Sequence, residues 1–225
     1  MNTQTQTPTQ TQAQPLQGML FVAADVAAAD DADFNDWYDH EHVEERARIP
    51  GFVSAARYES VEGGRRYLGL YRTESLGAFT TPAYRAAFGR QTPWSVANLD
   101  RMLDPMRRVC AVTPLAGQGS GSRVAVLTLA GDVAAATPQD TVRSLAAIPG
   151  FVRCYLLEPD ATLSTPLPKE STADRRLQPL LVIETGNASA DAAAVEAAHR
   201  ALPCEAGATA RYALRWKLHA SELAA

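Results

Sequence analysis

Cysteine is scarce in this chain of 225 residues, and Cys110, Cys154 and Cys204 lie far apart in the sequence. No CxxC pair occurs, so the pattern supports neither a disulfide framework nor a zinc site. Free cysteines are usually small, buried, apolar side chains. The cysteines therefore favour a reducing, cytoplasmic environment.

Long apolar runs and an excess of basic charge are also lacking. No stretch approaches the roughly 20 apolar residues that a transmembrane helix needs. The net charge of −4 leaves no basic stripe that would neutralise phosphates. We therefore expect neither nucleic acid nor membrane as a partner, and we expect a small-molecule ligand. Association with further copies of the chain is compatible with this composition.

Glycine-rich phosphate loops are missing too. The glycines at 63–64 and in the segment 117–122 (GQGSGS) lack the strand–turn–helix context of a nucleotide site. Residues 1–17 alternate threonine and glutamine and carry no charged side chain. They have neither the basic start nor the apolar core of a secretory signal, so we expect a disordered tail.

A pentapeptide repeat is the most informative feature that the chain does contain. The sequence IPGFV begins at Ile49 and again at Ile148, an offset of 99 residues. This offset suits a small α+β unit and is too long for a solenoid repeat. We therefore predict a tail (1–17), a first repeat (18–116) with the site, a linker (117–122) and a degenerate second repeat (123–219).

Apolar periodicity and turn residues predict the order β-α-β-β-α-β in each half. A glycine pair at 63–64 predicts a tight hairpin in the first half, where the second half has a long proline-containing excursion, residues 159–178. This order is ferredoxin-like and leaves one sheet face in need of a partner. The expected strands are 18–25, 52–60, 65–73, 106–113, 123–130, 151–158, 180–185 and 209–218, and the expected helices are 34–49, 76–88, 93–103, 137–148 and 190–202.

One motif resembles a known family. Phe34-x-x-Trp37-Tyr38-x-x-Glu41-His42, followed by the first IPG and by Tyr58, is similar to the EthD-type branch of the dimeric α+β barrel superfamily. The resemblance implies an α+β fold in which two tandem ferredoxin-like units pack sheet to sheet as a pseudo-dimeric barrel. The superfamily holds cofactor-free monooxygenases, lactone isomerases, polyketide-tailoring enzymes and haem proteins, so the resemblance implies a pocket more firmly than a reaction.

The first helix carries ionisable residues on its expected buried face. At about 100° per residue, His42 shares an arc with Tyr38 and Ile49. The 99-residue offset maps His42 onto Thr141, and it maps Arg46 onto Leu145. Ionisable side chains at positions that are uncharged in the other copy need partners or a functional reason.

These residues supply a candidate catalytic set. His42 suits general acid or base catalysis, because its reference pKa lies near neutrality. Tyr38 would donate a hydrogen bond to a substrate oxygen, and Arg46 would stabilise an enolate or carboxylate. Asp39 or Glu45 would fix the imidazole tautomer. The competing interpretation is a structural histidine in the protein interior.

Four further residues are candidates for substrate binding. Trp37 offers an aromatic surface, Tyr58 offers a phenol, and Trp94 after Pro93 suits an aromatic lid. Glu41 lies beside Phe34 on the helix and within reach of the pocket, with exposed salt bridging to Arg48 as its alternative role. For Trp37 the alternative is a core anchor, because aromatic residues at helical spacing ordinarily pack on a sheet.

No metal or cofactor is expected. His40 and His42 are two residues apart and so point to different faces of a helix. His199, the one residue weighed as a haem ligand, lies in an alanine-rich stretch without a supporting pattern. The sequence thus predicts a small-molecule enzyme with cofactor-free acid/base chemistry, of monooxygenase, isomerase or decarboxylase type, on an aromatic, quinone-like or polyketide-like compound. The alternative is a non-catalytic ligand-binding or assembly protein of the same fold.

Overall fold

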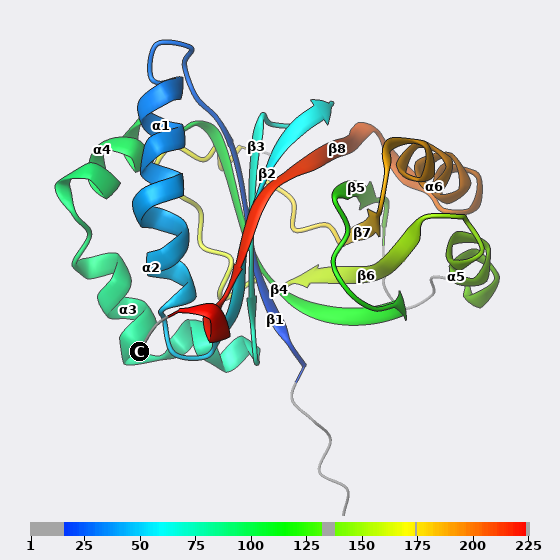
Figure 1. Ribbon diagram of the computed structural model, residues 1–225, viewed down its shortest axis with the longest axis horizontal. Helices are drawn as coiled ribbons and strands as arrows, with labels where there is room; N and C mark the ends of the chain where they lie inside the picture. Colours follow the sequence, from blue (N-terminus) through cyan, green and yellow to red (C-terminus); the bar gives the residue numbers. More distant parts are fainter. Residues whose placement is uncertain (1–15, 132–137, 174, 224–225) are drawn as a thin grey trace, which may run out of the picture.

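The computed structural model describes residues 16–131, 138–173 and 175–223, and the strands in these ranges form a closed barrel (Figure 1). The expected tail falls outside the described residues except for Leu16 and Gln17, and the Gln17 carbonyl accepts a hydrogen bond from the Val112 amide. The strands are β1 (Gly18–Asp25), β2 (Phe52–Glu62), β3 (Tyr67–Thr73), β4 (Leu103–Gly117), β5 (Arg123–Leu129), β6 (Phe151–Pro159), β7 (Leu180–Thr185) and β8 (Cys204–His219).

Each half of the chain contributes four neighbouring strands to the barrel. The order β4-β1-β3-β2 in the first half has the same pattern as β8-β5-β7-β6 in the second half, and all neighbours are antiparallel. The long strands β4 and β8 close the barrel by pairing with β6 and β2 of the other half. The two halves therefore share one continuous sheet.

The alternation of side chains assigns the two faces of this sheet. Leu68 and Leu70 of β3 point into the barrel lumen, whereas Tyr67 and Tyr71 pack under the helices outside. The hairpin before β3 turns as expected, because Gly63 and Gly64 both have positive φ angles, 66° and 63°.

Helices cover the outside of the barrel on two opposite sides (Figure 1). Helices α1–α4 lie over the first half, and α5 and α6 lie over the second half. None of the described helices has the length and apolar composition to cross a membrane. The helices are α1 (Asp31–Trp37), α2 (Val43–Ala47), α3 (Pro82–Gly89), α4 (Pro93–Arg101), α5 (Gln139–Ala146) and α6 (Ala188–Ala201), with 3₁₀ turns at Leu76–Thr80 and Ala220–Glu222.

The first helix differs from the regular α-helix expected over 34–49. It runs from α1 to α2 through a π-helical segment, Tyr38–His42, in which the Val43 amide bonds back to the Tyr38 carbonyl five residues earlier. Single π turns inside α-helices occur frequently at functional sites. Here the π segment carries the residues of the family-like motif.

The excursion of the second half covers an edge of the first half. The part of β4 before Cys110 has no strand partner on its β6 side. Asp160 donates its amide to the Val109 carbonyl at 2.8 Å, and the Ser164 hydroxyl accepts from the Val109 amide at 2.9 Å. Glu170 accepts from the Arg107 amide at 3.1 Å. The excursion therefore satisfies backbone groups of an exposed strand edge, and its Lys169 reaches Asp100 of helix α4.

Candidate functional site

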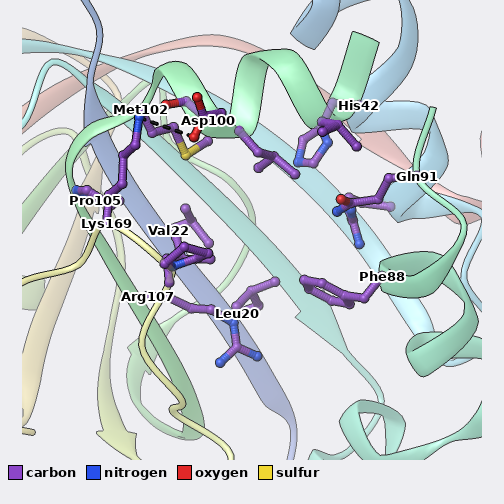
Figure 2. Close-up of a pocket in the computed structure, with 15 residues that line it drawn as sticks. Leu20, Val22, His42, Phe88, Gln91, Asp100, Met102, Pro105, Arg107 and Lys169 are labelled. Atoms are coloured by element: carbon purple, nitrogen blue, oxygen red, sulfur yellow. Dashed lines mark hydrogen bonds and ion pairs between the residues drawn. The ribbon is translucent and has the colours of Figure 1, made fainter. Parts of the chain in front are cut away.

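A cavity of about 320 Å³ lies between the outer face of β1 and the helices of the first half (Figure 2). This volume is within the range of small-molecule sites. Most of its wall is apolar, with Leu20, Val22, Phe88, Val96, Leu99 and Met102.

His42 points into this cavity from the π segment, and Phe88, Gln91 and Leu20 border the same space (Figure 2). The imidazole is only 6% exposed, and its ring centroid lies 4.2 Å from that of Trp37. The rings of Tyr38 and Tyr71 flank it at 5.0 and 6.1 Å. Its Nδ1 atom is buried and has no hydrogen-bond partner among the described residues.

The surroundings of His42 keep its imidazole neutral. Burial lowers the pKa of His42 well below its ordinary value of 6.5, and the positive charges of Arg46 and Arg57 lower it further. The ring is therefore unprotonated at neutral pH. It is able to accept a proton, and an anion bound beside it would favour that transfer.

Arg46 lines the same cavity without a counter-ion. The side chain is 3% exposed, and its Nη1 is buried without a hydrogen-bond partner. Its guanidinium lies over the Phe88 ring at 4.9 Å and makes no ion pair with a carboxylate of the described residues. A buried charge without such compensation is costly, so this position favours an anionic group of a ligand.

Arg57, which the sequence analysis did not select, organises the layer behind His42. It is 1% exposed and stacks between the rings of Tyr38 and Tyr67 at 4.6 and 4.9 Å. Its Nη1 donates to Asp39 at 2.9 Å. Asp39 also accepts from Trp216 Nε1 at 2.8 Å, so its carboxylate contacts Arg57 and Trp216. No hydrogen bond links Asp39 to the imidazole in the described part of the chain.

Glu41 fastens the π segment to helix α4. Its Oε1 accepts hydrogen bonds from Trp37 Nε1 at 3.2 Å, Thr92 Oγ1 at 2.6 Å and Ser95 Oγ at 2.8 Å. Trp37 is fully buried in the core under the helices. Glu45 is partly exposed, and burial together with the charge of Glu41 raises its pKa. Trp37 and Glu41 therefore support the helix behind the cavity wall, and within the described residues no hydrogen bond links Glu45 to the imidazole.

The remaining candidates lie elsewhere. Tyr58 points into the barrel lumen, on the opposite side of the sheet from His42. Trp94 donates from Nε1 to Asp33 of α1 at 3.1 Å and is not one of the residues that line the cavity. Of the nine residues proposed from the sequence, His42 and Arg46 are the two that line the cavity.

Arg107 and Lys169 complete the polar lining and were also missed. Arg107 donates to the Leu163 and Thr165 carbonyls at 2.8 and 3.0 Å, so it holds the excursion over the cavity. Lys169 forms an ion pair of 3.2 Å with Asp100, drawn as a dashed line in Figure 2. The sequence did contain one signal for Arg107. Arg107 and Arg108 are adjacent in an expected strand, so their side chains must point to opposite faces of the sheet. No local sequence pattern indicated that Lys169 of the excursion would line the cavity.

The corresponding face of the second half is apolar and packed. Thr141 and Leu145 are 6% and 0% exposed, as expected from the 99-residue offset. His199 is exposed on α6, where its Nε2 hydrogen-bonds with the Thr209 hydroxyl at 2.8 Å. Within the described ranges, no group of three or more His, Cys, Asp or Glu side chains has the arrangement of a metal site.

Comparisons with known proteins establish the fold. No protein-family model matches the chain, and no curated protein matches its sequence. Solved structures do match over most of its length. An anthrone oxidase-like protein aligns with a TM-score of 0.61 and 12% identity, covering 95% of this chain and 97% of that one.

Two further structures show the range of proteins with this fold. A candidate monooxygenase from Fusobacterium nucleatum aligns with a TM-score of 0.55 and 8% identity, over 91% of this chain and 95% of that one. A variant of chlorite dismutase from Candidatus Nitrospira defluvii has a TM-score of 0.53 and 9% identity, over 89% and 91%. The chain therefore has the fold of the dimeric α+β barrel proteins, as expected from the sequence at that level. Identities this low establish the fold alone.

Proposed function

We propose that the chain is an oxidative enzyme for small aromatic compounds, with His42 as the proton acceptor and Arg46 as the partner of the developing oxyanion. The observation that carries this proposal is a neutral imidazole and an unpaired guanidinium on the wall of one apolar cavity. The names of the structural neighbours, anthrone oxidase-like protein and monooxygenase, supply the substrate class.

An anthrone-type substrate illustrates the chemistry. The imidazole takes a proton from the ring methylene carbon, and the electron pair of that C–H bond moves onto the ring oxygen, where Arg46 stabilises the negative charge. The electron-rich carbon then reduces dioxygen and forms a C–O bond. The resulting peroxide takes the proton back from the imidazolium and loses water, which leaves a second carbonyl. One substrate and one O₂ thus give one quinone and one H₂O, without a cofactor.

The other residues of the first helix act as positioning residues in this proposal. Tyr38 and Arg57 hold the imidazole from behind, and Asp39 fixes Arg57. Trp37 and Glu41 fix the π segment against α4. Preorganised supports of this kind keep catalytic groups within a narrow geometry.

We further infer that the chain is a tandem pair of ferredoxin-like units of the EthD type. The identical strand order of the two halves supports this inference, as does the repeated IPGFV segment before β2 and β6. In this interpretation the first unit (18–116) carries the site and the second (123–219) closes it. A cytoplasmic location and self-association stay predictions.

Ligand binding without catalysis is the second candidate function. One observation favours it: among the described residues, Nδ1 of His42 has no partner that would fix the tautomer of the ring. Catalytic histidines are commonly oriented by a group at the second nitrogen. A binding protein needs only the apolar walls and the cation of Arg46.

Anthrone in aerobic buffer is the probe that tests the proposal. We expect the protein to accelerate anthraquinone formation and oxygen uptake above the rate of buffer. His42→Gln should lower the rate by about 10²–10⁴-fold, the usual contribution of a general base. Arg46→Gln should lower it by about 10²-fold or more, because an oxyanion partner is lost.

The matched control is His40→Gln, since His40 is exposed and interacts with Asp36 away from the cavity. This variant should keep the wild-type rate. Calorimetric titration with anthraquinone separates the two candidate functions. Binding that needs Arg46, without turnover of anthrone by the wild type, would support the binding protein and overturn the enzyme.

A further inference from the structure

One end of the barrel lumen is lined by an unbalanced set of charges. The pairings Phe52↔Thr73 and Ser54↔Arg72 join β2 to β3 there. In the other half, Phe151↔Thr185 and Arg153↔Glu184 join β6 to β7 with the same shift in register. The pair Ser54–Arg72 therefore occupies the position that corresponds to the ion pair Arg153–Glu184.

The second-half pair is fully satisfied. Glu184 is completely buried, and its Oε1 accepts hydrogen bonds from Arg153 Nε at 2.9 Å and from the Tyr155 hydroxyl at 3.1 Å. Its Oε2 accepts from the Gly121 amide at 2.9 Å. Both oxygens of this carboxylate therefore already accept hydrogen bonds, so Glu184 does not need a further cation as a partner.

The first-half position has the cation without a carboxylate. Arg72 forms no ion pair within the described residues. Its guanidinium lies over the Tyr155 ring at 5.7 Å, and its Nε is buried without a hydrogen-bond partner. Lys217 of β8 lines the same hollow and donates to the Ser120 hydroxyl at 2.6 Å. Burial and then the charge of Arg153 lower the pKa of both Arg72 and Lys217. Two carboxylates raise the pKa of Lys217. One is Glu184, which is already paired with Arg153, and the other is Glu222, which is exposed outside the lumen.

Hydroxyl groups face the same hollow. Tyr58 and Ser54 are 3% and 4% exposed, and both side chains line it. The space between these side chains is about 10 Å³, which is the room that one water-sized group needs. Three cations, one saturated carboxylate and two hydroxyl groups thus surround a very small space.

We propose that this end of the lumen binds a small monovalent anion, either a halide or the carboxylate of a small acid. The anion accepts hydrogen bonds from Tyr58, Ser54 and Arg72 and offsets the charge of Arg72 and Lys217. Its position is that of the carboxylate which the first half lacks. The site lies on the lumen side of the sheet, so it is separate from the His42 cavity and independent of the proposed function.

Thermal unfolding in defined anions tests this proposal. Sodium formate and sodium chloride replace sodium gluconate, whose anion is too large for the hollow, at constant ionic strength. We expect Tm of the wild type to rise with formate or chloride and to follow the mass action of a single site. A response to formate alone would identify a carboxylate site, and a response to chloride a halide site. An unchanged Tm in both salts would overturn the proposal.

Arg72→Gln and Tyr58→Phe locate the anion. Arg72→Gln should weaken the anion at least about tenfold, because a charged hydrogen-bond partner is lost. In gluconate alone it should match or exceed the wild type in Tm, since a partly buried cation without an ion pair among the described residues has been removed. Tyr58→Phe keeps the charge and should weaken binding by about tenfold.

Arg200→Gln is the matched control, because it makes the same charge change on the surface of α6. This variant should keep the anion response of the wild type. If Arg72→Gln fails to fold, Tyr58→Phe still decides the matter. Equal anion responses in Tyr58→Phe, Arg200→Gln and the wild type would show that the anion binds elsewhere.

Discussion

At the scale of the residue, His42 is defined by the charges around it. A buried histidine ordinarily gains a carboxylate or carbonyl partner, whereas His42 has aromatic rings and two arginines near it. Its imidazole is therefore held neutral, and Arg46 has no counter-ion in the part of the chain that the structure describes. A bound anion would stabilise the charge of Arg46 and a proton on His42 at once. The pair is therefore better suited to bind an anionic ligand than to act as a structural part of the core.

The same charges make the stability of the fold depend on pH through His42. The pKa of His42 lies near 6.5 when unfolded and well below that when folded. The unfolded chain therefore binds the extra proton first, so this stability is present above pH 6.5 and is lost as the pH falls toward the folded pKa. The loss should be about 1.4 kcal/mol per pH unit in that window. Urea unfolding between pH 7.5 and 5 measures it.

His42→Gln removes this dependence and should flatten the pH profile relative to the wild type. His199→Gln, at an exposed site, serves as the control and should keep the wild-type slope. Identical slopes for all three proteins would contradict a lowered pKa at His42.

At the scale of the element, local sequence patterns predicted the strands and turns, whereas contacts between residues far apart in the chain were not predicted. The glycine pair, the IPG stops and the apolar alternation predicted strands β1 and β7 with their observed bounds, and they predicted the ends of the other strands to within five residues. The π segment was not predictable, because a regular helical period was assumed from Phe34 to Ile49. His42 and Arg46 still fell on the buried face, since the comparison with Thr141 and Leu145 did not depend on that period.

The excursion is the element whose role depends most on contacts with distant residues. Glu170 is its anchor: the side chain is 4% exposed, pairs with Arg108 and accepts from Arg175 Nε at 2.7 Å. Burial alone would raise the pKa of Glu170, but the hydrogen bonds from Arg175 and Arg108 outweigh burial and lower it. The sequence shows a proline-containing excursion but not its contacts, because the partners of Glu170 on β4 are 62 and 63 residues away in the chain.

Removing this anchor should destabilise the protein strongly. Glu170→Ala leaves two largely buried arginines without their carboxylate, and breaking a buried pair in this way costs about 3–5 kcal/mol. Urea unfolding measures the loss. Glu196→Ala, which breaks a surface pair with Arg200, should change the free energy of unfolding by less than about 1 kcal/mol. A similar small effect in both variants would mean that Glu170 does not hold the excursion.

At the scale of the whole molecule, the barrel makes the two halves interdependent. The sequence predicted two units and their strand order, but the exchange that pairs β8 with β2 and β4 with β6 needs contacts between residues far apart in the chain. The excursion strengthens the same dependence, because a segment of the second half completes the cavity of the first. Neither half buries its sheet edges alone, so we expect one cooperative unfolding transition.

The tryptophans allow this cooperativity to be tested across the two halves. Trp37 and Trp94 belong to the first half, and Trp216 of β8 packs on the same side, beneath its helices. Leu181→Ala creates a cavity in the opposite core, where Leu181 is completely buried, and should cost about 2–5 kcal/mol. Tryptophan fluorescence and far-UV circular dichroism should then report the same lowered urea midpoint. Val96→Ala, at a site 53% exposed, should leave the midpoint nearly unchanged. A fluorescence midpoint that stays at the wild-type value in Leu181→Ala would show that the halves unfold independently.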